Sequence, residues 1–172
     1  MQLLHTHVHP ELSAPFGRKF YRPASRGIII NGEDILLLYT ARYDDYSLPG
    51  GGVDANEHIE NGLIRELEEE TGARNIRILS EFGRYREMRP WHKDDYDCVD
   101  MESFCYVCQI DPQLAETRLE SHEISNGMRP VWINIHQAIA HNVNTMAASP
   151  KKGLSIIRET FLLRQIVAEL ID

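Results

Sequence analysis

The chain has 172 residues, of which 42% are hydrophobic and 26% are charged, a composition typical of one soluble globular domain. Its formal net charge is −8, which argues against broad binding to the backbone of DNA or RNA, because such binding relies on clustered Lys and Arg. A small anionic substrate remains compatible with this charge, since a bound divalent metal ion supplies positive charge locally.

The N-terminus and the cysteines indicate a cellular location. The first ten residues, MQLLHTHVHP, lack the charged region and apolar run of a signal peptide. No stretch of the sequence approaches the roughly 20 apolar residues that a membrane span needs. Three cysteines without an export signal favour a reducing compartment. We therefore expect a cytoplasmic protein that does not cross a membrane.

The first half of the sequence predicts strands followed by one helix. Residues 1–20 are expected to contain a short strand and a loop. The apolar runs 25–30 and 35–39 flank a turn sequence, NGED, and predict a buried hairpin. Residues 48–53, rich in glycine, cannot be a helix. Over residues 56–71 apolar side chains recur at helical spacing, and the glycine that follows is a natural C-cap.

The second half predicts strands followed by two helices. Strands are expected over 76–87, 98–110 and 131–133, with loops over 88–97 and 114–129, and helices over 134–141 and 150–171. Cys105 and Cys108 have CxxC spacing, but residues three apart on a strand face opposite sides, so both are predicted to be core residues. The order of elements predicts an α/β or α+β layered fold, in a single domain over residues 1–172.

Three glutamates of the predicted first helix carry the strongest chemical signal. Glu66, Glu69 and Glu70 are three and four residues apart, so a helix places them on one face within about one turn. Like charges this close repel each other unless a cation neutralises them, and oxygen-only ligands suit Mg²⁺ or Mn²⁺. The alternative is a solvated acidic helix face, which is the reading we keep for Glu68.

The segment that contains these glutamates resembles the Nudix box. It reads Gly51-(five residues)-Glu57-(seven residues)-Arg65-Glu66-Leu67-Glu68-Glu69-Glu70-Thr71-Gly72-Ala73. Every fixed position of the box is matched, and only Ala73 stands where a larger aliphatic residue is usual. The lead-in at 46–51 and Trp132 also resemble the MutT-like Nudix hydrolases. The resemblance covers about 22–142 and leaves residues 1–20 and the C-terminal helix unexplained. It implies an α/β/α sandwich with a mixed β-sheet.

The resemblance also implies roles for individual residues. Glu66, Glu69 and Glu70 would bind Mg²⁺, with Mn²⁺ as an alternative, and the Gly50 carbonyl would be a further metal ligand. Glu57 and Arg65 match the pair that usually orients the site.

Many members use one more glutamate, after the box, as a metal ligand or general base. Here Glu120 and Glu123 are candidates, and Glu123 fits better on spacing. Glu102 is a weaker candidate, because it can lie on a strand.

The activity that the resemblance implies is hydrolysis of X–P–P–nucleoside to two phosphorylated products. Arg42 would bind a phosphate, and Tyr43, Tyr46 or Trp91 would stack on a base, although each of these side chains could also simply pack on the surface or in the core. The alternative function is a domain of the same fold that senses nucleotides or ADP-ribose without cleaving them. The retained box residues favour the enzyme.

The partner implied is a small nucleotide-like diphosphate. Nucleoside triphosphates, oxidised nucleotides, ADP-ribose, dinucleoside polyphosphates and nucleotide sugars all remain open as substrates. No DNA or RNA polymer and no membrane is expected to bind. A homodimer is compatible with the C-terminal helix.

Overall fold

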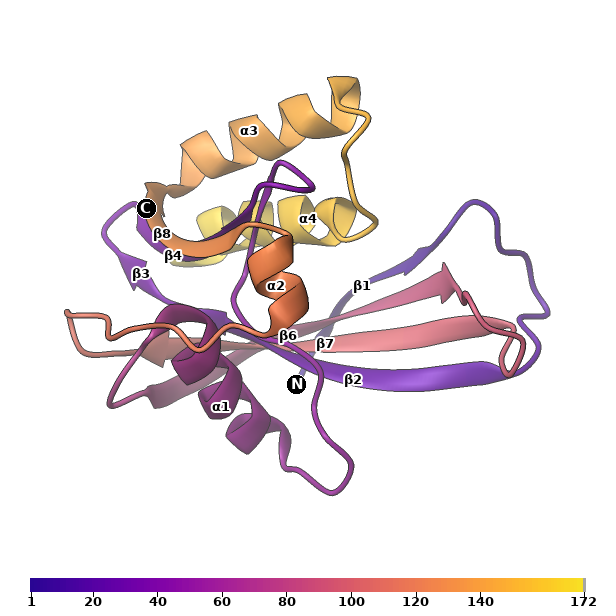
Figure 1. The fold of residues 1–172 in the computed structure, drawn as a ribbon, viewed down its shortest axis with the longest axis horizontal. Coiled ribbons are helices and arrows are strands. Elements are labelled where there is room, and N and C mark those ends of the chain that lie inside the picture. Colours follow the sequence, from indigo (N-terminus) through magenta and orange to yellow (C-terminus); the bar gives the residue numbers. More distant parts are fainter. Residues whose placement is uncertain (172) are drawn as a thin grey trace.

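A computed structural model describes residues 1–171, and its first sheet is long and mixed (Figure 1). This sheet has the strand order β1-β6-β7-β2. Its strands are β1 (Leu3–Val8), β2 (Lys19–Ile28), β6 (Arg77–Pro90) and β7 (Cys98–Gln109). The pairs β1–β6 and β2–β7 are parallel, whereas β6 and β7 form an antiparallel hairpin. The fold is therefore mixed α and β with a mixed sheet, as the sequence predicts.

The second sheet is antiparallel and centred on β4. Its strands are β3 (Ile30–Asn31), β4 (Asp34–Thr40), β5 (Asp45–Ser47) and β8 (Met128–Asn134). β4 pairs with β8 along its whole length, and with β3 and β5 over separate halves. Because a strand has only two edges, β3 and β5 share the edge of β4 that β8 leaves open. β5 is thus a short edge strand.

Helices cover the strands on two sides (Figure 1). They are α1 (Ile59–Thr71), α2 (Ser121–Ser125), α3 (Ile135–Ala148) and α4 (Ile156–Leu170). α1 packs against β2 and β8, whereas α3 and α4 pack on each other and on β5. No helix within residues 1–171 combines the length and apolar character needed to cross a membrane.

The core divides into two clusters of buried apolar side chains. One joins Ile28 and Leu37 to Leu162 and Ile166 of α4, and the other joins Leu36 to Leu63 and Leu67 of α1. Cys105 belongs to the first cluster and Cys108 to the second, so the two thiols lie on opposite faces of β7. Both are free and buried, and burial raises the pKa of each to about 12. The prediction that they are core residues is confirmed.

Several predicted boundaries are corrected by the structure. The turn between Asn31 and Asp34 is present, but the strand before it extends back to Lys19 and pairs with β7, so the predicted hairpin is limited to β3 and β4. β6 continues to Pro90, which pairs with Cys98, so the following loop is shorter than predicted.

The helices also differ in length from the predictions. α1 ends at the predicted C-cap, Gly72, whose φ is 73°, but it begins three residues later than predicted, after a turn in which the Glu57 N–H donates to Asp54. α2 lies within the predicted loop 114–129, α3 continues to Ala148, and α4 begins only at Ile156.

Candidate active site

The glycine-rich segment 48–53 lies directly against β2. The Ser25 N–H donates to the Gly51 carbonyl at 3.0 Å, and the Gly27 N–H donates to the Pro49 carbonyl at 2.9 Å. Gly50 has φ 130°, and a Cβ at this position would lie 2.0 Å from the Ser25 carbonyl oxygen. Only glycine allows this approach, because any side chain would collide with backbone that cannot move away.

Glu70 joins the end of α1 to this segment. Its carboxylate is 5% exposed and accepts a hydrogen bond from the Gly50 N–H at 2.6 Å. Burial raises the pKa of Glu70 well above its ordinary value, because the interior disfavours the charged form. Glu70 is therefore held beside the glycine segment, and the nearby Arg26 only partly offsets the effect of burial on its charged form.

Arg26 of β2 lies against the carbonyl of the same residue, Gly50. Its guanidinium donates to the Gly50 carbonyl, and its Nε is buried without a partner among the described residues. Burial lowers the pKa of Arg26, with a further contribution from Arg158. A carbonyl oxygen has two lone pairs, so the Gly50 oxygen retains one for a second partner.

Arg65 organises the outer part of the site. Its Nε and one terminal nitrogen donate to the two carboxylate oxygens of Glu57 at 3.0 and 3.1 Å, a two-point pairing that fixes both side chains. The Asp54 N–H also donates to Glu57, at 2.9 Å. Arg65, followed by this backbone bond, holds the pKa of Glu57 below its ordinary value. The pairing of Arg65 with Glu57 that the sequence suggests is present.

Glu66 and Glu69 differ in where they point. Glu66 lies over Gly51, where an added Cβ would approach its carboxyl carbon to 2.8 Å, and it accepts from Arg65 at 2.8 Å. Burial raises the pKa of Glu66, although the hydrogen bond from Arg65 opposes this effect. Glu69 lies 3.5 Å from Arg65 and is more exposed than Glu66.

A cavity of about 940 Å³ with acidic and basic side chains is lined by Gly50, Glu57, Arg65, Glu66 and Glu70, whereas Glu69 is absent from its wall. Glu123 reaches it from α2, where its carboxylate accepts the Glu120 N–H at 2.7 Å. The charged side chains on its wall are Arg22, Arg26, Asp54, Glu57, Arg65, Glu66, Glu70, Glu120 and Glu123. The cavity therefore offers carboxylates that can hold a cation and guanidinium groups that can bind an anion.

The NUDIX domain family model matches residues 21–154, which include the whole box and every residue on the cavity wall except Phe20. The chain belongs to the Nudix family. Curated relatives are RNA pyrophosphohydrolases, one from Campylobacter jejuni with 33% identity over 70 residues, which are 37% of this chain and 45% of the relative. Another, from Saccharophagus degradans, is 31% identical over 110 residues, 59% of this chain and 64% of the relative. The chain spans about half the length of the first of these relatives.

Two solved structures with similarity to this Nudix chain carry MutT names. A MutT Nudix hydrolase from Burkholderia pseudomallei has a TM-score of 0.45 and 22% identity, and the match covers 68% of this chain and 85% of that one. A MutT protein from Bacillus halodurans has a TM-score of 0.49 and 19% identity, with coverage of 69% and 72%.

The box residues of this Nudix chain fit a hard divalent cation by their donor chemistry. Carboxylate and carbonyl oxygens are the ligands that Mg²⁺ and Mn²⁺ prefer. Glu70 is a buried carboxylate and Glu66 a half-buried one, and burial disfavours the charged form of each. Within residues 1–171, however, no three acidic, His or Cys side chains are already gathered as a ligand cluster.

The substrate-binding residues suggested by sequence do not line the cavity. Arg42 is exposed and donates to Asn126 at 3.1 Å, and Tyr46 packs edge-on against His141. Trp91 packs against Phe20, and its indole N–H donates to Asp95 at 2.6 Å. Phe20 does line the cavity, so Trp91 is one side chain removed from it.

Two arginines of β2 were missed by the sequence reading. Arg22 and Arg26 are four apart on a strand and thus share a face, which turns toward the glycine segment. The spacing of these two arginines, four residues apart, was the available signal in the sequence.

Glu102, the weaker glutamate candidate, is bound by Arg84 at 2.5 Å and by the Tyr21 hydroxyl at 2.8 Å, and it is absent from the cavity wall.

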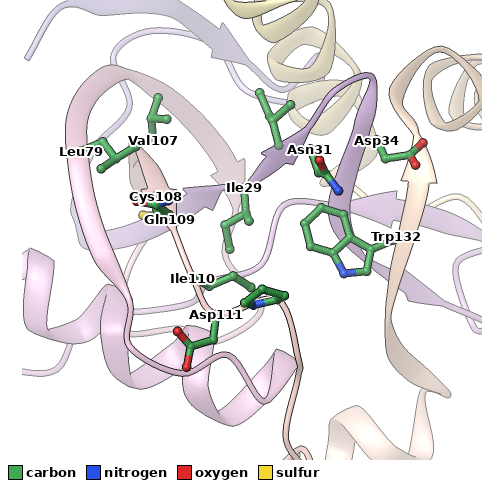
Figure 2. A pocket seen from close by; sticks show the side chains of 12 residues that line it. Ile29, Asn31, Asp34, Leu79, Val107, Cys108, Gln109, Ile110, Asp111 and Trp132 are labelled. Atoms are coloured by element: carbon green, nitrogen blue, oxygen red, sulfur yellow. The ribbon is translucent and has the colours of Figure 1, made fainter.

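A second hollow, of about 650 Å³, lies on another part of the surface (Figure 2). Trp132 of β8 is 40% exposed there, with Ile29 and Ile110 among its neighbours around the hollow. Asp34 and Asp111 are its only ionisable lining groups besides Cys108 within the described chain, and no box residue reaches it. It lacks the arginines that a phosphate would need, so the cavity at the box remains the candidate active site.

Proposed function

We propose that this chain is a metal-dependent hydrolase that cleaves the diphosphate linkage of a small nucleotide-like substrate. The observation that carries the proposal is the meeting of Glu66, Glu70 and Glu123 with Arg22 in one cavity beside the glycine segment. Membership of the Nudix family and the pyrophosphohydrolase names of the relatives support the same reaction class. Water would add to one phosphorus, and the bridging oxygen would leave with the other phosphate.

The box residues would have two roles, metal binding and positioning. Glu66, Glu69, Glu70 and the Gly50 carbonyl would hold Mg²⁺ or Mn²⁺, which when bound would neutralise phosphate oxygens and lower the pKa of a water molecule. Arg65 and Glu57 would keep the end of the box segment in place through their two-point pairing.

Glu123 would accept the proton of the attacking water, and Arg22 would bind the substrate phosphates. One oxygen of Glu123 is engaged by the Glu120 N–H, which leaves the other free for this transfer. Arg22 is exposed on the cavity wall, where it can pair with an anion without losing another partner.

The net charge of −8 favours a small substrate over a long RNA chain, because polymer binding needs many phosphate contacts. The relatives are named for RNA, however, so a triphosphorylated RNA end belongs in the test. The panel is nucleoside triphosphates, oxidised nucleotides, ADP-ribose, dinucleoside polyphosphates, nucleotide sugars and a 5′-triphosphorylated oligoribonucleotide. Both phosphorylated products are separated and quantified with Mg²⁺, with Mn²⁺ and with a chelator.

Glu70→Gln is the decisive variant, because its amide oxygen can still accept the Gly50 N–H while the charge is lost. Glu68→Gln is the matched control, since Glu68 lies on the same helix but is exposed and absent from the cavity wall. We expect metal-dependent turnover in the wild type and the control, and none in Glu70→Gln. Tight binding of one compound without turnover by any protein would overturn the proposal in favour of a sensor.

A further inference from the structure

The strand that leads into the glycine segment has an open edge that the C-terminal helices close. β5 is an edge strand, so its outward backbone groups lack a neighbouring strand. Asn142 of α3 accepts the Tyr46 N–H at 2.9 Å and donates to the Tyr46 carbonyl at 2.8 Å. Leu48 lies two residues after Tyr46, and its N–H donates to Glu159 of α4 at 2.8 Å. Side chains thus replace the hydrogen bonds of a missing strand.

Glu159 is an unusual partner for a backbone amide, because it is a carboxylate with 0% exposure. Its other oxygen accepts two hydrogen bonds from Arg158, at 2.7 and 3.0 Å. Arg158 is equally buried and also pairs with Glu87, which in turn pairs with Arg89 at 2.8 Å. The positive charges of Arg158 and Arg89 therefore balance the negative charges of Glu87 and Glu159. One oxygen of Glu159 accepts the Leu48 N–H.

The contact at Leu48 lies two residues before Gly50, which Glu70 and Arg26 hold in the candidate site. Leu48 is fully buried, and Pro49 follows it with a fixed φ, so little freedom remains between Leu48 and Gly50. Gly50, which lines the cavity, then donates its N–H to Glu70 and accepts from Arg26 through its carbonyl. A change in the position of Leu48 would therefore move the donor that holds Glu70.

We propose that Glu159 is a positioning residue of the active site, which fixes the glycine segment through the Leu48 N–H. The proposal rests on the hydrolase function proposed above. It assigns a task to α4, which lies beyond residue 154, where the match to the family model ends. Glu159 does not line the cavity, so it acts through the backbone that it holds and through its charge, which also faces Arg26 on the cavity wall.

Amide hydrogen exchange, measured by NMR on the whole chain without metal, tests the contact itself. In Glu159→Gln, Arg158 is expected to take the amide oxygen, so the side-chain NH₂ would face the Leu48 N–H and the bond would be lost. Exchange at Leu48 and Gly50 should rise roughly tenfold or more relative to Leu36 in the core. Glu87→Gln is the matched control, because it removes a carboxylate from the same buried network without touching the segment.

The proposal would be overturned if exchange rose uniformly over all amides in Glu159→Gln, or if it rose equally at Leu48 and Gly50 in Glu159→Gln and Glu87→Gln. In either case Glu159 would stabilise the fold as a whole and would not hold the glycine segment specifically. If Glu159→Gln does not accumulate in folded form, Glu159→Asp replaces it. Aspartate keeps the charge that Arg158 needs but lies one methylene farther from Leu48, so the same selective rise is expected in weaker form. An unchanged ratio of Leu48 to Leu36 exchange in Glu159→Asp would equally reject the contact.

Turnover then separates this proposal from the function on which it rests. With an active substrate, kcat should fall roughly tenfold or more in Glu159→Gln and change little in Glu87→Gln, with KM nearly constant in both. If exchange rises selectively at Leu48 and Gly50 but kcat is unchanged, the contact does not position the site and the proposal is rejected. If the wild type hydrolyses no panel compound while exchange still rises selectively, the proposed function fails and the contact between α4 and the segment stands.

Discussion

The carboxylate of Glu70 and the backbone N–H of Gly50 are joined by a hydrogen bond of 2.6 Å. This bond connects the last turn of α1 to the glycine segment, and Arg26 also binds Gly50 through its carbonyl. Gly50 therefore meets a carboxylate at its N–H and a guanidinium at its carbonyl. Its position depends on the absence of a side chain at residue 50.

Gly50→Ala is expected to lower the free energy of unfolding by about 3 kcal/mol or more. The new Cβ would lie 2.0 Å from the Ser25 carbonyl oxygen, at a φ of 130° that alanine rarely adopts. Urea unfolding measures the loss. Gly32→Ala is the control, since φ is 63° there but nothing lies within 4 Å of the added Cβ, and about 1 kcal/mol is expected. Equal losses would contradict the close approach at Gly50.

Arg65→Lys should lower activity or metal affinity about 10–100-fold, although the charge is kept. Lysine cannot reproduce the two parallel hydrogen bonds that Arg65 makes to Glu57. Steady-state kinetics and Mn²⁺ titration measure the effect. Arg118→Lys is the control, because Arg118 is exposed and lies 3.9 Å from Glu68. A loss in the control as large as in Arg65→Lys would show that the paired geometry is unimportant.

The parts of the fold that sequence predicted well are those set by local periodicity. The apolar spacing over α1 predicts the helix, and Gly72 ends it with the left-handed φ that the sequence suggests. The partner of a strand is not a local property. The apolar run 25–30 predicts a hairpin with β4, yet all ten residues of β2 pair with β7, about 80 positions away.

The site could be predicted from sequence where the box fixes spacing on a helix, and less well elsewhere. Glu66 and Glu70 share a cavity because helical geometry leaves little choice, and Glu123 joins them through the short helix α2. Which aromatic or basic side chain reaches the cavity depends on how loops pack. Arg42 is the arginine that the sequence favours for a phosphate, whereas Arg22 is the exposed arginine on the cavity wall.

Arg22→Ala is therefore expected to raise KM roughly tenfold for an active phosphate substrate and to leave the free energy of unfolding nearly unchanged, because the side chain is exposed. Arg42→Ala, which removes only the exposed contact to Asn126, should leave KM unchanged. Initial rates over a range of substrate concentrations compare the two variants. A rise in KM for Arg42→Ala alone would restore the sequence-based choice and remove Arg22 from the phosphate site.

The raised pKa of Asp45 predicts how the free energy of unfolding depends on pH. Burial, followed by the nearby carboxylates of Glu159 and Asp44, raises the pKa of Asp45 from 3.8 to about 6. The folded state thus binds a proton more tightly than the unfolded state, so this stabilisation is complete below about pH 4 and is lost as pH rises through about 6.

Asp45→Asn removes the titration and keeps the size of the side chain. The variant should be more stable than the wild type by about 1–3 kcal/mol at pH 8, and the difference should shrink as the pH approaches 4. Urea unfolding of both proteins between pH 4 and 8 measures this trend. Asp54→Asn is the control, since Asp54 is exposed, and its unfolding curve should follow the wild type at every pH. A constant difference between Asp45→Asn and the wild type across the range would mean that Asp45 ionises normally in the folded protein.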